Sequence, residues 1–193
     1  MDRKAVIDIG TNSIKLYVAE LGPDGSLATV IDKNNIARLG EGMDEERTLQ
    51  QEAIRRNAEA VAEFADLAKS NGAGEIVAVG TMALRTAKNA KDFIDAVRDL
   101  SGIEVRVIPG EEEAEFAYLA VLSGIGASVE RLAVCDVGGG STEFIFGGQA
   151  GIDRRFSINL GAVKVSADYL SSDPPSSKEV EDAISYVLDV LKE

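Results

Sequence analysis

Two segments of this sequence share a spacing of aspartate, glycine and serine that suits the binding of phosphate. Asp8-Ile-Gly-Thr-Asn-Ser13 lies near the first residue, and Asp136-Val-Gly-Gly-Gly-Ser141 begins 128 residues later. Because glycine permits close approach of the backbone, a tight turn can point successive N–H groups at an anion. We therefore predict two phosphate-binding turns, formed by Thr11, Asn12 and Ser13 and by Gly138, Gly139, Gly140, Ser141 and Thr142.

Three carboxylates next to these turns predict a metal ion. Asp8 and Asp136 open the two segments, and Glu143 follows the second one. A carboxylate beside a phosphate repels it unless a cation such as Mg²⁺ lies between them. The chain has no histidine, so its metal ligands must be chiefly carboxylates. We predict Mg²⁺ held by Asp8, Asp136 and Glu143; the alternative is two ordinary hairpin turns with exposed carboxylates.

Two further candidates follow predicted strands, at the edge where open α/β sheets place their sites. The run Glu111–Glu113 opens a helix after strand 103–108, and a glutamate there can activate water. The helix dipole alone favours acidic residues in a first turn by about 0.3–1 kcal/mol each, so the run by itself is a weak indication. Arg85 can bind phosphate through its planar guanidinium, or it is a solvated helix residue. Lys15 and Arg38 are further cationic candidates.

The composition excludes several classes of protein. Lys and Arg total 20 against 33 Asp and Glu, and the net charge of −13 gives no general attraction to nucleic acid or anionic membranes. Cys135 is the single cysteine, which excludes an internal disulfide. No stretch reaches the roughly 20 apolar residues of a membrane span, so we expect a cytoplasmic protein. Phosphohistidine chemistry, His-based triads and the P-loop are excluded by missing residues.

The pattern of apolar residues predicts an α/β fold. Strands are expected first, over residues 4–9, 14–21 and 27–38. A helix over 49–70 follows, because its apolar residues recur at helical spacing. Strands and helices then alternate, over residues 75–80, 82–99, 103–108 and 110–123. Such alternation implies parallel strands joined by right-handed crossovers.

The same order of elements begins again in the second half. Strands are expected over 131–137, 142–147 and 152–158, followed by a helix near 161–170. A last helix opens at Ser176, with Glu179 at the spacing of a capping box. Leu39-Gly40 and Leu160-Gly161 occupy comparable places after the third strand of each copy. We infer a duplicated fold with mixed sheets, a first domain over 1–123 and an incomplete second domain over 124–193, whose open edges favour association, for example as a homodimer.

Together these motifs resemble the exopolyphosphatase and guanosine pentaphosphate phosphohydrolase family, which has the duplicated ribonuclease-H-like superfold of actin, hexokinase and the chaperone ATPases. The resemblance rests on six segments: Asp8–Ser13, Arg38–Gly42, Ala83–Asn89, Gly110–Ala114, Asp136–Glu143 and Leu160–Val163. It implies that Glu113, rather than Glu112, is the general base. It also implies that Asp136 and Glu143 position Mg²⁺ with Asp8 lining the site, and that Arg85 grips the substrate.

The function implied by the resemblance is release of the terminal phosphate from inorganic polyphosphate or from guanosine pentaphosphate. The acidic charge slightly favours a short or nucleotide substrate, because the channel for a long polyphosphate would be basic. Family members continue past the point where this chain ends, which leaves two alternatives. One is a truncated protein that binds polyphosphate or a guanosine alarmone without cleaving it. The other is a kinase of the same superfold, for which the sequence offers neither an acceptor-binding domain nor an adenine pocket.

Overall fold

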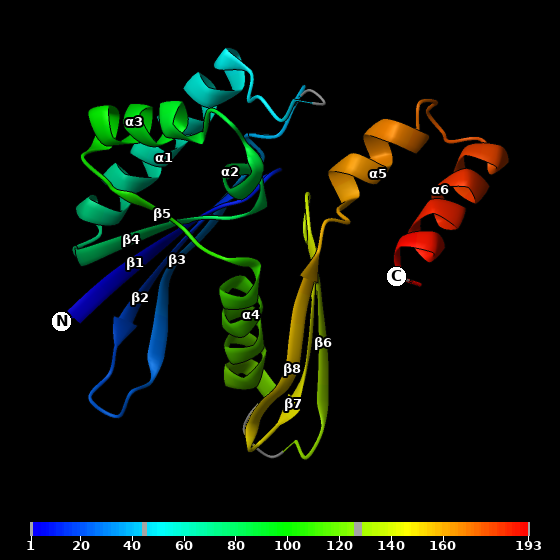
Figure 1. Cartoon of the computed structure of the whole chain (residues 1–193). Coiled ribbons are helices and arrows are strands. Elements are labelled where there is room, and N and C mark those ends of the chain that lie inside the picture. Colours follow the sequence, from blue (N-terminus) through cyan, green and yellow to red (C-terminus); the bar gives the residue numbers. More distant parts are fainter. Residues whose placement is uncertain (1, 44–45, 126–128, 193) are drawn as a thin grey trace. The chain divides into compact units, whose positions relative to one another are not determined.

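A computed structural model of the chain describes residues 2–43, 46–125 and 129–192. The chain divides into two compact units between Pro109 and Gly110. Each unit combines a β-sheet with α-helices (Figure 1), which confirms the predicted α/β class.

The first unit contains a five-stranded mixed sheet in the order β3-β2-β1-β4-β5. Its first three strands form an antiparallel meander, and the last two add in parallel on the other side of β1, as the alternation of strands and helices predicts. The strands are β1 (Asp2–Ile9), β2 (Ile14–Leu21), β3 (Leu27–Asn35), β4 (Ala73–Gly80) and β5 (Val105–Val107).

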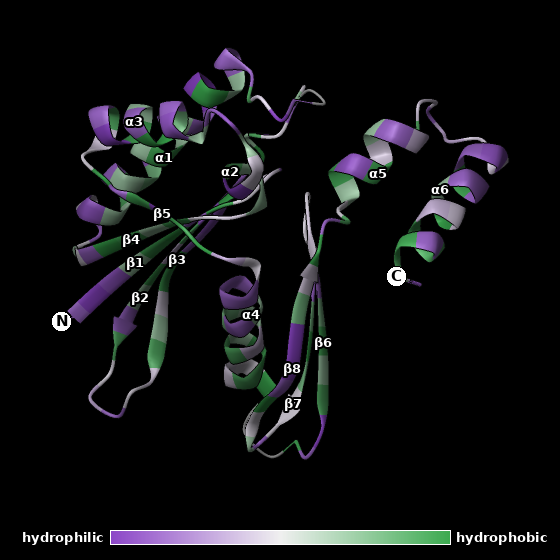
Figure 2. Cartoon of the chain, viewed as in Figure 1, coloured by the Kyte–Doolittle hydropathy of each residue, from purple (hydrophilic) through white to green (hydrophobic). Residues whose placement is uncertain are grey.

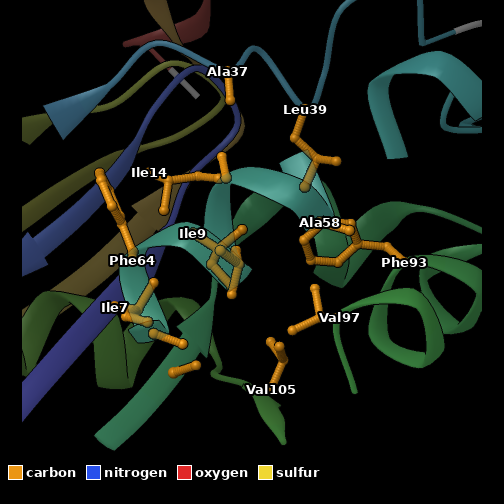
Figure 3. Close-up of a cluster of buried hydrophobic side chains, with 14 of the residues drawn as sticks. Ile7, Ile9, Ile14, Ala37, Leu39, Ala58, Phe64, Phe93, Val97 and Val105 are labelled. Carbon is orange, nitrogen blue, oxygen red and sulfur yellow. The ribbon is translucent and has the colours of Figure 1, made fainter. Parts of the chain in front are cut away.

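One face of this sheet is buried beneath α1 (Gln51–Ser70) and α3 (Ala90–Ser101). Successive strand residues point to opposite faces, so Ile7 and Ile9 of β1 both enter the core and are fully buried. Figure 3 shows Phe93 of α3 among the side chains that fill this core. Figure 2 shows that α3 also carries hydrophilic residues. The buried apolar surface provides the main stabilisation of the unit.

Two predicted elements of the first unit differ in the structure. The helix expected over 82–99 is broken into α2 (Met82–Thr86) and α3, because the Asn89 amide between them binds the backbone of Leu49. Asn89 Oδ1 accepts the Leu49 N–H at 2.8 Å, and Asn89 Nδ2 donates to the Leu49 carbonyl at 3.1 Å. The strand expected to reach residue 38 ends at Asn35. Three residues later, Arg38 adopts a left-handed conformation with a φ of 52°, which is incompatible with a continued strand.

The second unit is built on a three-stranded antiparallel meander, formed by β6 (Leu132–Val137), β7 (Thr142–Gly148) and β8 (Gly151–Ile158). Helix α4 (Gly110–Ile125) packs on one face, where Ala114 and Tyr118 meet Ile145 in a buried cluster. The Tyr118 hydroxyl donates to the Gly148 carbonyl at 2.9 Å. The predicted first domain, residues 1–123, includes this helix, whereas its packing groups it with β6, β7 and β8.

Two helices follow the meander, α5 (Ala162–Tyr169) and α6 (Ser177–Val190). They contact each other through Tyr169 and Tyr186, whose ring centroids lie 4.9 Å apart. The predicted capping box at the start of α6 is confirmed, with both of its hydrogen bonds formed. Within the described part of the chain, no helix is both long and apolar enough to span a membrane.

Candidate phosphate and metal site

The first glycine turn joins β1 to β2. It is closed by the Gly10 N–H, which donates to the Ser13 carbonyl at 2.9 Å. The loop after β3 packs against this turn, and the Gly40 N–H donates to the Thr11 carbonyl at 2.9 Å. A Cβ on Gly40 would lie 2.5 Å from Thr11 Cγ2, so glycine lets the loop come this close.

The second glycine turn joins β6 to β7 with the same closing bond, from the Gly138 N–H to the Ser141 carbonyl at 2.9 Å. The start of α5 packs against it, and the Val163 N–H donates to the Gly139 carbonyl at 2.9 Å. A Cβ on Gly161 would lie 2.3 Å from the Gly139 carbonyl oxygen. The two predicted Leu-Gly pairs therefore do occupy comparable places, each against the fourth residue of its Asp-x-Gly segment.

Both turns leave backbone donors that an anion can use. In the described part of the chain, no backbone–backbone hydrogen bond uses the N–H groups of Thr11, Asn12, Gly139 or Gly140 as donors. The side chains of Ser141 and Thr142 are buried, and the Thr142 hydroxyl donates to the Leu160 carbonyl at 2.5 Å. Thr142 thus supports the second turn through that bond.

The two turns differ in the residue that pairs with the aspartate. In the first unit Asp8 lies opposite Lys15, and in the second Asp136 lies opposite Glu143. Directly opposite residues of antiparallel strands have their side chains on the same face. The first turn therefore places an ammonium near a carboxylate, whereas the second places two carboxylates together. Carboxylates that share a site repel each other, and a divalent cation relieves this repulsion.

Glu143 is the most enclosed of the candidate carboxylates, with 1% of its surface exposed. The Ser157 hydroxyl donates to Glu143 Oε1 at 2.7 Å. Burial is the main cause that raises the pKa of Glu143, and the negative charges of Glu113 and Asp136 raise it further. Hydrogen bonds from Ser157 and Ser141 act in the opposite direction. In the second unit the charges of two predicted site carboxylates, Glu113 and Asp136, therefore act on a third, Glu143.

Glu113 lies in the first turn of α4 and is partly buried, while Asp136 is exposed at the end of β6. Among the described residues, no group of three or more Asp, Glu or Cys side chains is close enough to hold a metal ion by itself. A metal bound here would take its remaining ligands from water or from substrate oxygens.

The remaining candidates belong to the first unit. Arg85 lies in α2, and its Nη1 donates to the Ile108 carbonyl at 3.1 Å, which ties α2 to the residue after β5. Lys15 is exposed on β2. The predicted meeting of Asp8, residues 11–13 and Arg85 with the carboxylates of the second unit stays a prediction.

Ser157 is a residue of this site that the sequence analysis does not identify. Its bond to Glu143 spans 14 positions of the chain and depends on the register of β7 with β8. The available signal was a single polar residue between Phe156 and Ile158 in a predicted strand, which is common on any half-exposed sheet.

With the fold and the two glycine turns described, the chain can be compared with known proteins. The profile of the Ppx/GppA phosphatase family matches residues 17–193, and the chain belongs to this family. "Exopolyphosphatase 2" of Mycobacterium tuberculosis is 34% identical over 200 residues, which span 100% of this chain and 62% of that protein.

Two further proteins extend the comparison. The "Guanosine-5'-triphosphate,3'-diphosphate pyrophosphatase" of Photobacterium profundum is 36% identical over 159 residues, 82% of this chain and 32% of that protein. A crystal structure of an exopolyphosphatase from Cytophaga hutchinsonii gives a TM-score of 0.90 at 27% identity, covering 98% of this chain and 61% of that one. The chain thus spans about three fifths of the length of the two exopolyphosphatases.

Proposed function

We propose that this chain forms the catalytic region of an enzyme that releases the terminal phosphate from inorganic polyphosphate or guanosine pentaphosphate. The observation that carries the proposal is the grouping of Glu113, Asp136 and Glu143 beside the glycine turn of the second unit. The names of the relatives support this substrate class, since they include exopolyphosphatases and a guanosine-5'-triphosphate,3'-diphosphate pyrophosphatase.

The residues present suit Mg²⁺. This ion prefers oxygen ligands, keeps several waters, and is usually held by one or two carboxylates together with substrate phosphates. Asp136 and Glu143 supply two such carboxylates from paired positions of neighbouring strands. We propose that they hold Mg²⁺, with Asp8 lining the same site. Bound there, the ion would offset the negative charge of the phosphate oxygens.

The protein's own groups then have distinct tasks. The backbone N–H groups of the two glycine turns hold phosphate oxygens, and Arg85 grips the substrate through its guanidinium. Glu113 orients a water molecule in line with the terminal phosphorus and accepts its proton, a role that contributes roughly 10²–10⁴-fold. Positioning and electrostatics supply the rest, as in other phosphoryl transfers.

We also infer that the two units derive from one duplicated ribonuclease-H-like domain. The support is the repeated meander, in which both aspartates pair with the residue seven positions further on, Lys15 or Glu143. The loop or helix start that follows each meander contacts the fourth residue of its Asp-x-Gly segment. The described second unit has a sheet of three strands where the first has five.

Phosphate release from polyphosphate and from guanosine pentaphosphate, with and without Mg²⁺, tests the proposed function. We expect release only with Mg²⁺, and we expect Glu113→Gln to lower kcat by roughly 10²-fold or more while substrate binding is largely kept. Glu111→Gln, an exposed neighbour in the same helical turn, is the matched control and should retain activity.

Two other results would redirect the assignment. Tight binding of either substrate without release would support a non-catalytic binding protein. Transfer of phosphate to an acceptor other than water would support a kinase. Full turnover by Glu113→Gln would remove this residue from the role of base.

A further inference from the structure

Strand β8 places two polar side chains on the face of the sheet that α4 covers. Ser157 lies opposite Glu143 of β7, and Arg155 lies opposite Ile145, whose side chain packs against α4. Because residues two apart on a strand share a face, Ser157 and Arg155 both point to the side of the candidate site. Neither residue has a part in the proposed chemistry.

Ser157 fixes the orientation of a buried carboxylate. Its hydroxyl donates to Glu143 Oε1 at 2.7 Å, and Glu143 is almost completely removed from solvent. A buried carboxylate oxygen that loses its donor is costly, so this bond selects one arrangement of the Glu143 side chain. Ser157 therefore fixes one oxygen of the Glu143 carboxylate, to which Ser141 also donates a hydrogen bond.

Arg155 acts on the helix that carries the proposed base. Its Nη1 donates to Glu115 Oε2 at 2.8 Å, and Glu115 follows Glu113 by two residues in the first turns of α4. The two side chains are 34% and 45% exposed, and an ion pair with this exposure contributes little to stability. The pair nevertheless joins the N-terminal end of α4 to β8, and this restricts where that end of the helix can lie.

We propose that β8 supplies the positioning residues of the site: Ser157 orients the Glu143 carboxylate for the cation, and Arg155, through Glu115, holds the helical turn that carries Glu113. This inference rests on the proposed function, since it assigns the two residues to the same reaction. The two residues of β8 have different tasks, because Ser157 serves metal binding and Arg155 serves the activation of water.

Binding of Mn²⁺, followed by electron paramagnetic resonance on the full chain, tests Ser157 without any turnover. We expect Ser157→Ala to weaken Mn²⁺ binding by roughly 10-fold or more, as is typical when an outer-shell partner of a metal ligand is lost. Ser157→Thr keeps the hydroxyl and should restore most of the affinity. Equal Mn²⁺ affinity of Ser157→Ala and the unmodified chain would overturn the role of Ser157. An unmodified chain that binds no Mn²⁺ would overturn the metal site of the proposed function, and the role of Ser157 with it.

Steady-state kinetics test Arg155. We expect Arg155→Met and Glu115→Gln each to lower kcat by roughly 10–10²-fold with little change in KM, because a displaced base affects the chemical step rather than binding. The double variant Glu115→Arg with Arg155→Glu reverses the pair and should recover part of kcat, whereas Mn²⁺ affinity should stay unchanged in all three variants.

The matched control is Lys178→Met, which breaks an ion pair with Asp182 on α6 and should leave kcat unchanged. A loss of kcat without any recovery in the reversed pair, or unchanged kcat in Arg155→Met, would overturn the role of Arg155. A chain that binds Mn²⁺ but releases no phosphate in unmodified form would contradict the proposed hydrolysis and the role of Arg155, while the Ser157 comparison would still decide its own role.

Discussion

In the first unit the aspartate before the glycine turn lies opposite Lys15, and in the second it lies opposite Glu143. The bond that closes each turn is the same, a glycine N–H to serine carbonyl contact of 2.9 Å. One strand position therefore changes a pair of opposite charges into a pair of carboxylates. We infer that the backbone of each turn provides donors for an anion, and we propose that the paired strand residue decides whether a cation is needed beside it.

The helices cover opposite faces of the two meanders. In the first unit α1 and α3 bury Ile7 and Ile9, so Asp8 points to the other face. In the second unit α4 covers the face of Glu143, and Val137, the counterpart of Ile9, stays 63% exposed. The carboxylates of the second turn thus share their face with the helix that carries Glu113, which is why Glu113 affects Glu143.

The largest difference is expected when the two counterpart residues of the sheets are shortened. Ile9→Ala removes a fully buried side chain and should destabilise the first unit by roughly 2–5 kcal/mol, because a cavity remains. Val137→Ala, on the exposed face of β6, should cost less than about 1 kcal/mol. Urea unfolding followed by circular dichroism measures both. Similar losses would contradict the opposite coverage of the two meanders.

A smaller difference is expected when alanine replaces the glycine that packs against each turn, Gly40 in the first unit and Gly161 in the second. The Cβ of Gly161→Ala would meet the backbone of Gly139, which cannot rotate away, and we expect a loss of about 1–3 kcal/mol. The Cβ of Gly40→Ala would meet the methyl group of Thr11, which can move, so its loss should be smaller. Thermal unfolding of both variants checks the order, and a larger loss in Gly40→Ala would contradict it.

The smallest effect concerns the pH dependence of the metal-free chain. Burial raises the folded-state pKa of Glu143 above its ordinary value of 4.5. A group whose pKa is raised by folding makes its full contribution to stability at pH values below its pKa in the unfolded state. This contribution is lost as the pH rises through its pKa in the folded state. Glu143→Gln should therefore be more stable than the unmodified chain at neutral pH without divalent cations, but not at pH values below 4.5.

Urea titrations at several pH values, with EDTA present, measure this trend. The exposed Glu63→Gln is the control and should show no such gain at neutral pH. Added Mg²⁺ should stabilise the unmodified chain and not Glu143→Gln, because the ion binds the folded state through that carboxylate. A gain in Glu143→Gln that is equal at every pH would show that the titration of Glu143 is not its cause.

Much of this architecture follows from local patterns in the sequence. The meanders follow from alternating apolar residues and short turns, and the start of α6 follows from the capping pair Ser176 and Glu179, which needs only neighbours in the chain. The break at Asn89 was missed because its partner, Leu49, lies 40 positions away. Contacts of that range depend on packing and leave no periodic signal.

The candidate site divides in the same way. Its turns and carboxylates stand out because aspartate, glycine and serine recur at one spacing. The preference for Glu113 over Glu112 came from the family resemblance, since helix periodicity cannot separate adjacent residues; the charge of Glu113 does act on Glu143 in the structure. Ser157 and Arg155 were not predictable, because their roles come from strand register and from a cross-element ion pair.

Mn²⁺ affinity of two matched variants, Asp136→Asn and Asp8→Asn, tests most directly the claim that the second turn holds the cation. The predicted result is a loss for Asp136→Asn greater than the roughly 10-fold expected for an outer-shell partner, and a much smaller loss for Asp8→Asn, whose carboxylate lies opposite Lys15. Equal losses in the two variants, or a larger loss in Asp8→Asn, would contradict the claim.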